Sequence, residues 1–283
     1  MSKPTLPFLE TMVTQVCNLS CEGCTNYSDQ RHSGYVTWAQ GRAEIEPWLD
    51  RVDIPDFGIM GGEPLINPEI ESWLLGARNL MPAAQLRFTT NGLLLHKWPN
   101  LLPLLHDIGN CVFKITVHVN DLALEQIIEK IFSQYHWEPV TEYGIARWQT
   151  TNNLKFQINR PSHFLKTFQG PYHSMAPFNS SPEAAFDACV QKTCPLLYQG
   201  RIYKCSTSAL LQDTLDRYNR PNWAEWEPLI QSGISPDSTD YEIENFINNF
   251  GRPHAQCKQC PTAQQPLLNH AVTVFKKSQA SST

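Results

Sequence analysis

Three cysteines near the start of the chain, Cys17, Cys21 and Cys24, have the spacing CX3CX2C. A cubane iron–sulfur cluster held by cysteine normally takes four thiolates, one for each iron. No fourth cysteine lies in the adjacent sequence, so a cluster held here would leave one iron open to another ligand. The spacing therefore constrains this part of the chain to a loop that presents three thiols to one metal centre.

A zinc site, a redox pair or unliganded thiols would each account for fewer of these residues. A structural zinc site needs a fourth ligand, and the adjacent loop supplies none. A redox CX2C pair at Cys21 and Cys24 would not call for Cys17. Unliganded buried cysteines are not expected at such tight spacing in a loop. An iron–sulfur cluster with three protein ligands accounts for all three positions together.

The bulk composition fits a globular protein and excludes some functions. The chain has 283 residues, enough for one large domain or a domain with a small appendage. Its formal net charge of −5 argues against a surface for DNA or RNA backbones, although not against a small nucleotide-containing ligand. No signal peptide is visible, and no apolar run approaches the roughly 18 residues of a membrane helix. Nine cysteines without an export signal point to metal or catalysis and to a cytoplasmic location.

The first half of the sequence alternates strand and helix patterns, which is typical of parallel βα units. Helices are expected over 38–52 and 122–135, and a third helix should begin near Asn67, with Asn67 as N-cap and Pro68 in the first turn. The expected strands are 8–16, 56–60, 85–90, 111–119, 143–149 and 154–158.

The second half has a different composition. A stretch rich in proline and serine, 161–182, marks a domain boundary. Beyond it we expect a hairpin around Gly200 and helices over 206–218 and 241–248. The predicted domains are 1–170, 171–265 and a tail, 266–283, whose polar end is expected to be disordered.

A second motif, Gly61-Gly62-Glu63-Pro64, ends the expected strand 56–60. Alone, it is a common kind of loop, although glycines let a backbone approach a ligand and a carboxylate can hold an ammonium group. With the three cysteines one βα unit earlier, the pattern resembles the radical S-adenosylmethionine superfamily. The resemblance covers residue 8 to about 158. It implies a [4Fe–4S] cluster whose open iron binds the amino and carboxylate groups of S-adenosylmethionine.

The resemblance also implies roles for individual residues. Gly62 and Glu63 would hold the ammonium group of S-adenosylmethionine. Members of the family usually carry an aromatic residue just before the third cysteine; here that position is Gly23, and Tyr27 is expected to supply the aromatic contact. The implied cofactor-binding residues are Gly61, Gly62, Glu63, Pro64, Thr90, Asn91, Thr116 and Tyr27.

No catalytic side chain is assigned, and His118 and Cys189 are the candidates. In the expected strand 111–119, Thr116 and His118 share one face with Lys114, which we expect to be the barrel interior. Either could reach cofactor or substrate, and either could equally be a polar residue satisfied by structural hydrogen bonds.

A second group of cysteines lies near the C-terminus. Cys194 and Cys205 bracket the expected hairpin, and Cys257 and Cys260 form a CX2C pair. A zinc ribbon would also use two pairs around a hairpin. Given the resemblance, the run from Gly200 to Cys205 is similar to the GX4C element of SPASM and Twitch extensions. It implies a single auxiliary [4Fe–4S] cluster held by Cys194, Cys205, Cys257 and Cys260.

Two cysteines remain outside this count. Cys111 is most simply a buried small hydrophobic residue. Cys189 also fits the cysteine spacing at the start of the extension, Cys189-X10-Gly200-X4-Cys205. Three interpretations therefore stay open: Cys189 replaces Cys194 as cluster ligand, acts as a thiol donor, or only packs against its neighbours.

The predicted fold is therefore α/β, a partial (β/α)6 barrel with a small C-terminal α+β cap. The resemblance implies reductive cleavage of S-adenosylmethionine and abstraction of a hydrogen atom, with oxidation or cross-linking of a peptide or protein as the outcome. No leader-binding domain precedes the first expected strand, which leaves oxidation of a sugar, aminoglycoside or nucleoside precursor as an alternative. A non-catalytic zinc or iron–sulfur scaffold is the third hypothesis. The expected electron donor is a flavodoxin or a ferredoxin.

Overall fold

The computed structural model describes residues 3–142, 145–161, 163–266 and 272–274. Its main feature is a nine-stranded sheet in the order β11-β10-β1-β3-β4-β5-β8-β7-β6. The run from β10 to β8 is parallel, and antiparallel strands extend it at both edges. The strands are β1 Leu9–Met12, β3 Asp56–Met60, β4 Gln85–Thr90, β5 Cys111–Thr116, β6 Glu138–Glu142, β7 Ile145–Gln149, β8 Leu154–Asn159, β10 Leu196–Tyr198 and β11 Arg201–Tyr203.

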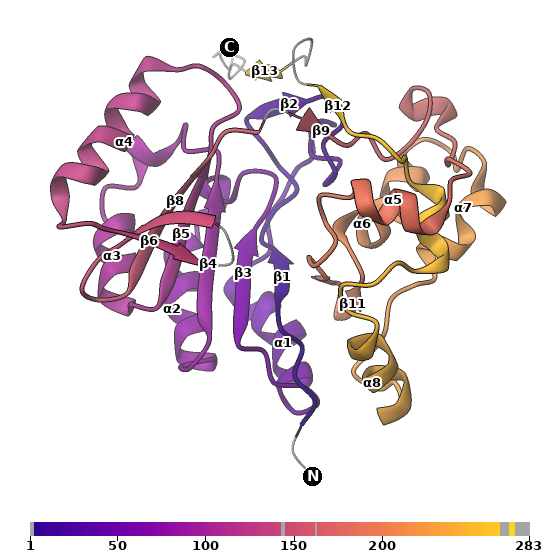
Figure 1. Ribbon diagram of the computed structural model, residues 1–283, viewed down its shortest axis with the longest axis horizontal. Coiled ribbons are helices and arrows are strands. Elements are labelled where there is room, and N and C mark those ends of the chain that lie inside the picture. The colour runs from indigo at the N-terminus through magenta and orange to yellow at the C-terminus, as the bar shows by residue number, and fades with distance from the viewer. Residues whose placement is uncertain (1–2, 143–144, 162, 267–271, 275–283) are drawn as a thin grey trace, which may run out of the picture.

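The helices fall into two groups, one in each half of the molecule (Figure 1). The first group accompanies the parallel strands: α1 Trp38–Leu49, α2 Ile70–Leu80, α3 Leu101–Ile108 and α4 Leu122–Gln134. The second group forms a separate lobe, called the cap here: α5 Pro182–Ala188, α6 Ser206–Arg217, α7 Trp223–Ile230 and α8 Asp240–Asn248. The predicted α/β class with a parallel partial barrel is confirmed. Among the described helices, none has the length and apolar character needed to cross a membrane.

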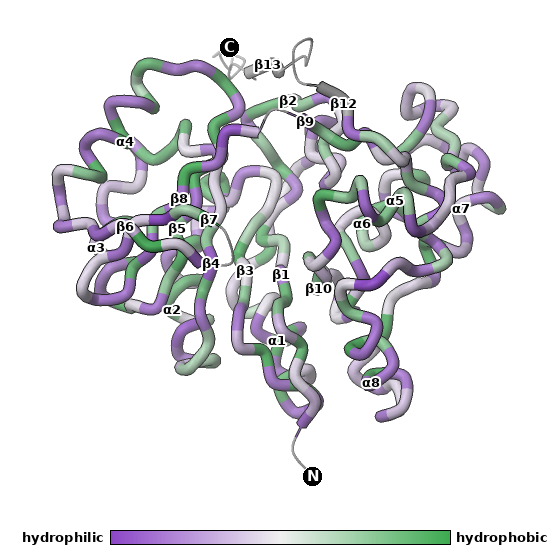
Figure 2. The backbone as a smooth tube through the Cα atoms, viewed as in Figure 1, coloured by the Kyte–Doolittle hydropathy of each residue, from purple (hydrophilic) through white to green (hydrophobic). Residues whose placement is uncertain are grey.

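The hydrophobic pattern explains how the barrel half forms. Its largest core cluster lies between the sheet and the helices, with Phe57, Phe88 and Phe113 on the helix-facing side of β3, β4 and β5. The tube of α4 alternates between hydrophobic and hydrophilic residues (Figure 2), and its Leu124 and Ile128 are buried. Such alternation is what an amphipathic helix needs to cover a sheet.

The sequence predicted β3 and β4 with their observed bounds, and other elements less well. The first strand is shorter than expected, because the chain leaves the sheet after Met12. The strand β6 was not predicted. Asn67 is not the N-cap of α2, which begins at Ile70. Its side-chain amide donates instead to the carbonyl oxygens of Val13 at 3.0 Å and Val36 at 2.9 Å.

The cap contributes to the sheet of the barrel. The hairpin β10–β11 forms around Gly200 as predicted, and β10 pairs in parallel with β1. The sheet therefore includes a strand from beyond the domain boundary predicted near residue 170, and that boundary stays a prediction. The helix α5 was missed, although Ser181 caps it and Pro182 occupies its first position.

Part of the predicted tail pairs with the cysteine loop. Strand β13, Val272–Val274, lies antiparallel to β2, Leu19–Cys21. Strand β12, Gln265–Pro266, pairs with β9, His163–Phe164. The end of the chain that was expected to be disordered, 275–283, lies outside the described residues.

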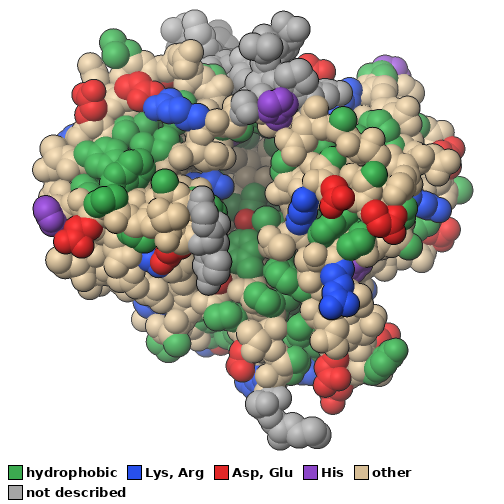
Figure 3. All heavy atoms as spheres, in the orientation of Figure 1, with side chains coloured by type: hydrophobic (Ala, Val, Ile, Leu, Met, Phe, Trp, Pro, Cys, Tyr) green, Lys and Arg blue, Asp and Glu red, His purple; other side chains and the backbone are tan. Residues whose placement is uncertain are grey.

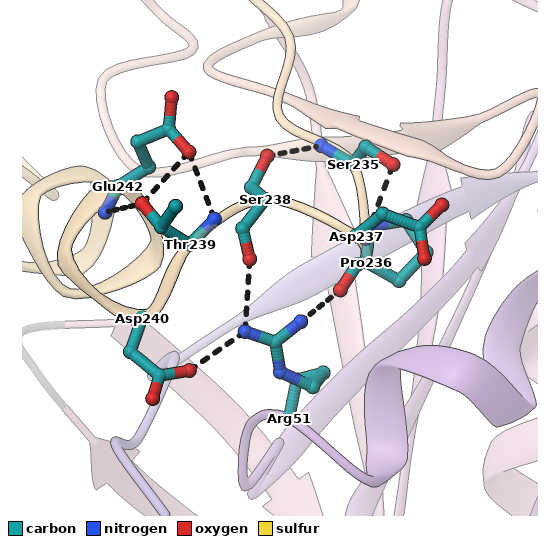
Figure 4. Close-up of polar contacts among 8 residues, drawn as sticks. All are labelled: Arg51, Ser235, Pro236, Asp237, Ser238, Thr239, Asp240 and Glu242. Carbon is teal, nitrogen blue, oxygen red and sulfur yellow. Dashed lines mark hydrogen bonds and ion pairs between the residues drawn. The ribbon is translucent and has the colours of Figure 1, made fainter.

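Side chains from α1 and from the turn that follows it hold the cap against the barrel. The guanidinium of Arg51 donates to the carbonyl oxygens of Pro236 and Ser238 and to the carboxylate of Asp240, all in the segment that leads into α8 (Figure 4). The indole of Trp48 donates to the carbonyl oxygen of Gly200 at 2.9 Å. Between the two halves the surface is hollowed, with hydrophobic and acidic side chains visible at the bottom (Figure 3).

Two glycine–tryptophan contacts set the crossing of α1 and α2. The rings of Trp38 and Trp73 meet edge to face with centroids 5.2 Å apart. A Cβ atom at Gly41 would lie 1.8 Å from the ring of Trp73, and one at Gly76 would lie 2.1 Å from the ring of Trp38. Because Trp73 is fully buried and its indole donates to the carbonyl oxygen of Val36 at 2.8 Å, it has little freedom to move away.

This contact predicts the effect of Gly41→Ala. In an open helix position the change would stabilise by about 1 kcal/mol through helix propensity. Here we expect a destabilisation of about 1–3 kcal/mol, because the new methyl group overpacks the core. Combining it with Trp73→Phe, which removes the ring atoms that meet the methyl, should lower the cost of the alanine. Urea unfolding of the wild type, the two single variants and the double variant measures both effects. Stabilisation by Gly41→Ala alone would contradict this packing.

Candidate functional site

The three N-terminal cysteines face one cavity at the end of the barrel strands. Cys17 follows β1, Cys21 ends β2, and the backbone N–H of Cys24 donates to the carbonyl oxygen of Cys21 at 3.1 Å. All three line the same cavity. Gly23 has a φ of +75°, and a Cβ atom there would lie 3.3 Å from the Cβ of Lys166. The turn therefore disfavours an aromatic side chain at position 23.

The cavity disfavours free thiolates. Burial raises the pKa of Cys17 to about 12 and raises those of Cys21 and Cys24 as well. The neighbouring cysteines raise the pKa of Cys21 further, because thiolates repel one another. Thiolates are the form that binds metal, and a metal centre supplies the positive charge that offsets their burial. The donor set therefore fits a metal centre with several positive charges.

The arrangement does not suit a single metal ion. Within the described parts of the chain, no three His, Cys, Asp or Glu side chains converge as ligands of one ion. Structural zinc requires four ligands around one centre, whereas a cubane cluster binds each thiolate at a different iron. Three thiols that share a cavity without converging fit the cluster better than zinc.

Two glycines bring the cysteine loop against the end of β3. The N–H of Gly62 donates to the carbonyl oxygen of Thr14 at 2.7 Å, and the N–H of Glu63 donates to that of Val16 at 2.8 Å. A Cβ atom at Gly62 would lie 2.5 Å from the carbonyl oxygen of Val16, and one at Gly61 would lie 2.6 Å from that of Thr14. Any side chain at either position would push the cysteine loop away. Gly61 and Gly62 also line the cavity.

The carboxylate of Glu63 holds the ends of two strands together. It is fully buried and accepts hydrogen bonds from the Thr90 hydroxyl at 2.6 Å and from the N–H groups of Asn91 at 2.7 Å and Leu65 at 3.1 Å. Neither Glu63 nor Pro64 lines the cavity. The expectation that the Glu63 carboxylate itself holds an ammonium group does not fit this placement. Glu63 positions the loops, and Pro64 starts a short 3-10 helix, Pro64–Ile66.

Two asparagines complete the polar wall of the cavity. The side-chain amide of Asn91 donates to the Oδ1 of Asn18 at 2.7 Å, which ties β4 to the cysteine loop. Asn26 donates to the carbonyl oxygen of Gly61 at 3.4 Å, and its own Oδ1 is buried without a hydrogen-bond partner among the described residues. A buried acceptor without a partner is costly. An ammonium donor in the cavity would satisfy it.

Most of the other predicted residues also line the cavity. Thr90, Asn91, Thr116 and His118 are among its walls, and the His118 ring lies 5.7 Å from that of Phe164. From the sequence, the polar residues directly after the third cysteine were not identified as part of the cavity wall. Only their position next to that cysteine could have indicated this role. The lining residues that it did not single out include Asn26, Ser28, Asp29, Met60 and Phe164.

Tyr27 does not lie in the cavity wall. Its side chain is fully buried in a second core cluster with Phe168 and Met175, and its hydroxyl is 3.3 Å from that of Thr167. It is not among the cavity-lining residues, so the expected aromatic contact does not fit this placement. A core position between barrel and cap cannot be recognised from the local sequence.

In the cap, three of the four expected cysteine ligands lie together with Cys189. Burial raises the pKa of Cys260 well above its usual value, and the thiols of Cys205, Cys189 and Cys257 raise it further. Cys205 stands at the start of α6, Cys257 lies within a short 3-10 helix, Ala255–Gln259, and Cys260 follows the end of that helix. Cys189, Cys205 and Cys257 therefore lie close enough to Cys260 to disfavour its thiolate.

Cys194 points to the barrel instead. After burial, the groups that most affect its pKa are Glu10 of β1 and Lys114 of β5, ahead of Cys189. Cys194 precedes β10, whose pairing with β1 brings it beside Glu10. Cys189 thus acts on Cys260 together with Cys205 and Cys257, whereas Cys194 is affected by Cys189 but more strongly by Glu10 and Lys114. Sequence spacing did not distinguish Cys189 from Cys194 as the cluster ligand, because both precede Gly200.

The buried Glu63 predicts a pH dependence of stability. Burial raises its pKa from 4.5 to about 7, so ionising it costs more in the folded protein than in the unfolded chain. Its contribution to stability is fully present below pH 4.5 and is lost as the pH rises to about 7. In Glu63→Gln, the decrease in the free energy of unfolding across this window should be smaller, as urea titrations at several pH values would show. The exposed Glu129→Gln is the control, and an unchanged pH slope in Glu63→Gln would contradict the assignment.

Comparison with known proteins agrees with this geometry. Residues 11–142 match the sequence model of the Radical SAM superfamily. The chain is 32% identical over 90 residues to a "Probable GTP 3',8-cyclase" of Pyrobaculum aerophilum, a match that covers 32% of this chain and 28% of that protein.

Two solved structures show weaker likeness. SuiB of Streptococcus suis bound to the precursor peptide SuiA is 19% identical, with a TM-score of 0.35, over 44% of this chain and 26% of that one. BtrN in complex with AdoMet and 2-DOIA is 13% identical, with a TM-score of 0.48, over 92% of this chain and 94% of that one. These likenesses are too weak to assign a substrate. The match and the site geometry together identify residues 11–142 as a Radical SAM domain.

Proposed function

We propose that this enzyme reductively cleaves S-adenosylmethionine and abstracts a hydrogen atom from a substrate held between barrel and cap. When bound, a reduced [4Fe–4S] cluster and S-adenosylmethionine supply a 5′-deoxyadenosyl radical, which takes a hydrogen atom from an unactivated carbon. The observation that carries the proposal is the single cavity lined by Cys17, Cys21 and Cys24 together with Gly61 and Gly62.

Different residues around this cavity would hold the cluster and the S-adenosylmethionine. The three thiols would hold the cluster and leave one iron open. The close approach of Gly61 and Gly62, and the acceptor Oδ1 of Asn26, suit an ammonium group. Glu63 would contribute indirectly, because its hydrogen bonds fix the position of the loops that carry these groups.

The cap thiols suit a second cluster. We propose that Cys189, Cys205, Cys257 and Cys260 hold an auxiliary [4Fe–4S] cluster with four protein ligands. The Twitch-like spacing implies such a cluster, with Cys194 in the place that we give to Cys189. Such a cluster, when bound, supplies an acceptor for the electron left on the substrate after hydrogen abstraction. The net reaction would then be an oxidation or a cross-link rather than an isomerisation.

Two substrate classes remain within this proposal. One is a peptide or protein, and the other is a small molecule such as a sugar, aminoglycoside or nucleoside precursor. A flavodoxin or ferredoxin would supply the electron for cleavage. All nine cysteines are free, which suits the reducing cytoplasm that this chemistry requires.

A non-catalytic metal scaffold is the candidate of another class. It would bind zinc or iron at the same thiols and would form no 5′-deoxyadenosine. The close approach of Gly61 and Gly62 at the cavity wall favours the enzyme, because it leaves room for a ligand beside the thiols that a scaffold binding only metal does not require.

The cleavage reaction itself can be tested directly. After anaerobic reconstitution with iron and sulfide, the wild-type protein with dithionite and S-adenosylmethionine should form 5′-deoxyadenosine, measured by chromatography. Replacing Cys17, Cys21 and Cys24 by Ala should abolish product formation, whereas Cys257→Ala with Cys260→Ala should leave some cleavage. Stoichiometric zinc without any 5′-deoxyadenosine in the wild type would overturn the proposal.

The cap ligands predict a difference between two single variants. Wild type should bind about eight irons, four for each cluster. Cys189→Ala should bind about four, because it loses a ligand of the cap cluster, while Cys194→Ala should keep about eight. Iron and acid-labile sulfide analysis measures both. The opposite result, with Cys194→Ala losing the iron, would show that the cap rearranges when it binds its cluster.

A further inference from the structure

The inner face of the barrel carries two charged residues just below the cavity. Lys114 pairs in register with Thr89, which lines the cavity, and lies two residues before Thr116, which also lines it. Side chains two residues apart on a strand share a face and are separated by about 7 Å. Glu10 lies on the same face of β1, two residues before the partner of Met60.

Gly58 makes room for Glu10. A Cβ atom at this position of β3 would lie 2.8 Å from the Cγ of Glu10 and 3.1 Å from the ring of Phe8. The side chain of Glu10 therefore lies across β3, on the inner face of the sheet. We call the face formed by Glu10, Lys114 and their charged neighbours the barrel floor.

The neighbouring charges on the barrel floor are paired. The guanidinium of Arg87 donates to both carboxylate oxygens of Asp56, with its Nε 2.6 Å from Oδ1. Glu142 accepts from both Arg147 and Lys155. Among the described residues of the floor, these pairs leave Glu10 as the anion that faces Lys114.

Among the described residues, no hydrogen bond or ion pair reaches the ammonium of Lys114 or the carboxyl of Glu10. Burial lowers the pKa of Lys114, and Arg87 and Arg147 lower it further, against the opposing effects of Glu10 and Cys194. Burial also raises the pKa of Glu10 to about 7, so at neutral pH Glu10 supplies only part of a counter-charge.

The floor as a whole has an excess of positive charge. It holds four cations and three anions, which leaves one positive charge when all are ionised and two when Glu10 is protonated. The cations are Arg87, Lys114, Arg147 and Lys155, and the anions are Glu10, Asp56 and Glu142. Lys114 is partly buried, and an anionic ligand would offset the cost of holding its charge there.

Lys114 is partly exposed, and its neighbours Thr89 and Thr116 line the cavity. We propose that Lys114 binds the carboxylate or phosphate of a small anionic substrate, which places the substrate's carbon skeleton toward the cavity wall at Thr89 and Thr116. The inference deepens the proposed function by naming the substrate class, since the substrate must lie beside the radical site. Anion binding can nevertheless be tested without any cleavage of S-adenosylmethionine.

The test uses three probes with the same carbon skeleton: glycerate, glycerol 3-phosphate and uncharged glycerol. Each is titrated calorimetrically into the reconstituted protein, without reductant. We expect at least one anion to bind about tenfold or more tightly than glycerol, in line with a charge-assisted hydrogen bond. Which anion binds tighter distinguishes a carboxylate site from a phosphate site.

Three variants assign the site to Lys114. Lys114→Met should weaken binding of the anion to the level of glycerol binding, and Lys114→Arg should keep most of the affinity. The exposed Lys97→Met should leave the affinity unchanged. Anion binding that persists in Lys114→Met would overturn the proposal. So would failure of both anions to bind wild type below about 50 mM, an outcome that favours a peptide substrate. Lys114→Arg keeps the test valid if the Met variant unfolds.

Discussion

The buried carboxylate of Glu63 joins the parts of the barrel on which the site depends. Its hydrogen bonds to Thr90 and Asn91 fix the end of β4 to the end of β3. The adjacent backbone bonds, from Gly62 to Thr14 and from Glu63 to Val16, then fix the cysteine loop to β3. A single acidic side chain and two close backbone contacts thus determine where three thiols lie.

The same parts explain why the motif needs its residue types. Glycine is required at 61 and 62 because the backbone of the cysteine loop occupies the space of a side chain. Glutamate is required at 63 because its carboxylate must reach donors on two loops at once. In the proposed function, the motif therefore acts on the ligand through its glycines and on the scaffold through its acid.

The sequence predicted the elements whose signal is local. Strands β3 and β4 were found with their observed bounds, because turn residues flank both, and β4 also alternates between buried and partly exposed positions. The exposed strand β6 was missed, since it has few buried side chains to create a pattern. The placements of Glu63, Tyr27 and Cys194 depend on contacts between segments that are far apart in the chain, which spacing cannot encode.

Barrel and cap are also linked through their chemistry. Tyr27 lies in the core between them, and both Cys24 of the barrel and Cys205 and Cys260 of the cap contribute to its raised pKa, after burial. Arg51 and Trp48 hold the cap from the opposite end of the molecule. The proposed two clusters would thus lie on either side of one buried core, with the charged barrel floor below.

The central claim is that three thiols leave one iron open to S-adenosylmethionine. Electron–nuclear double resonance on the reduced, reconstituted protein tests it most directly, with S-adenosylmethionine that carries ¹⁵N at the amino group. The account predicts a resolved ¹⁵N coupling to the cluster signal, because the amino nitrogen would bind iron. A cluster signal of full intensity without any ¹⁵N coupling, at saturating S-adenosylmethionine, would contradict it.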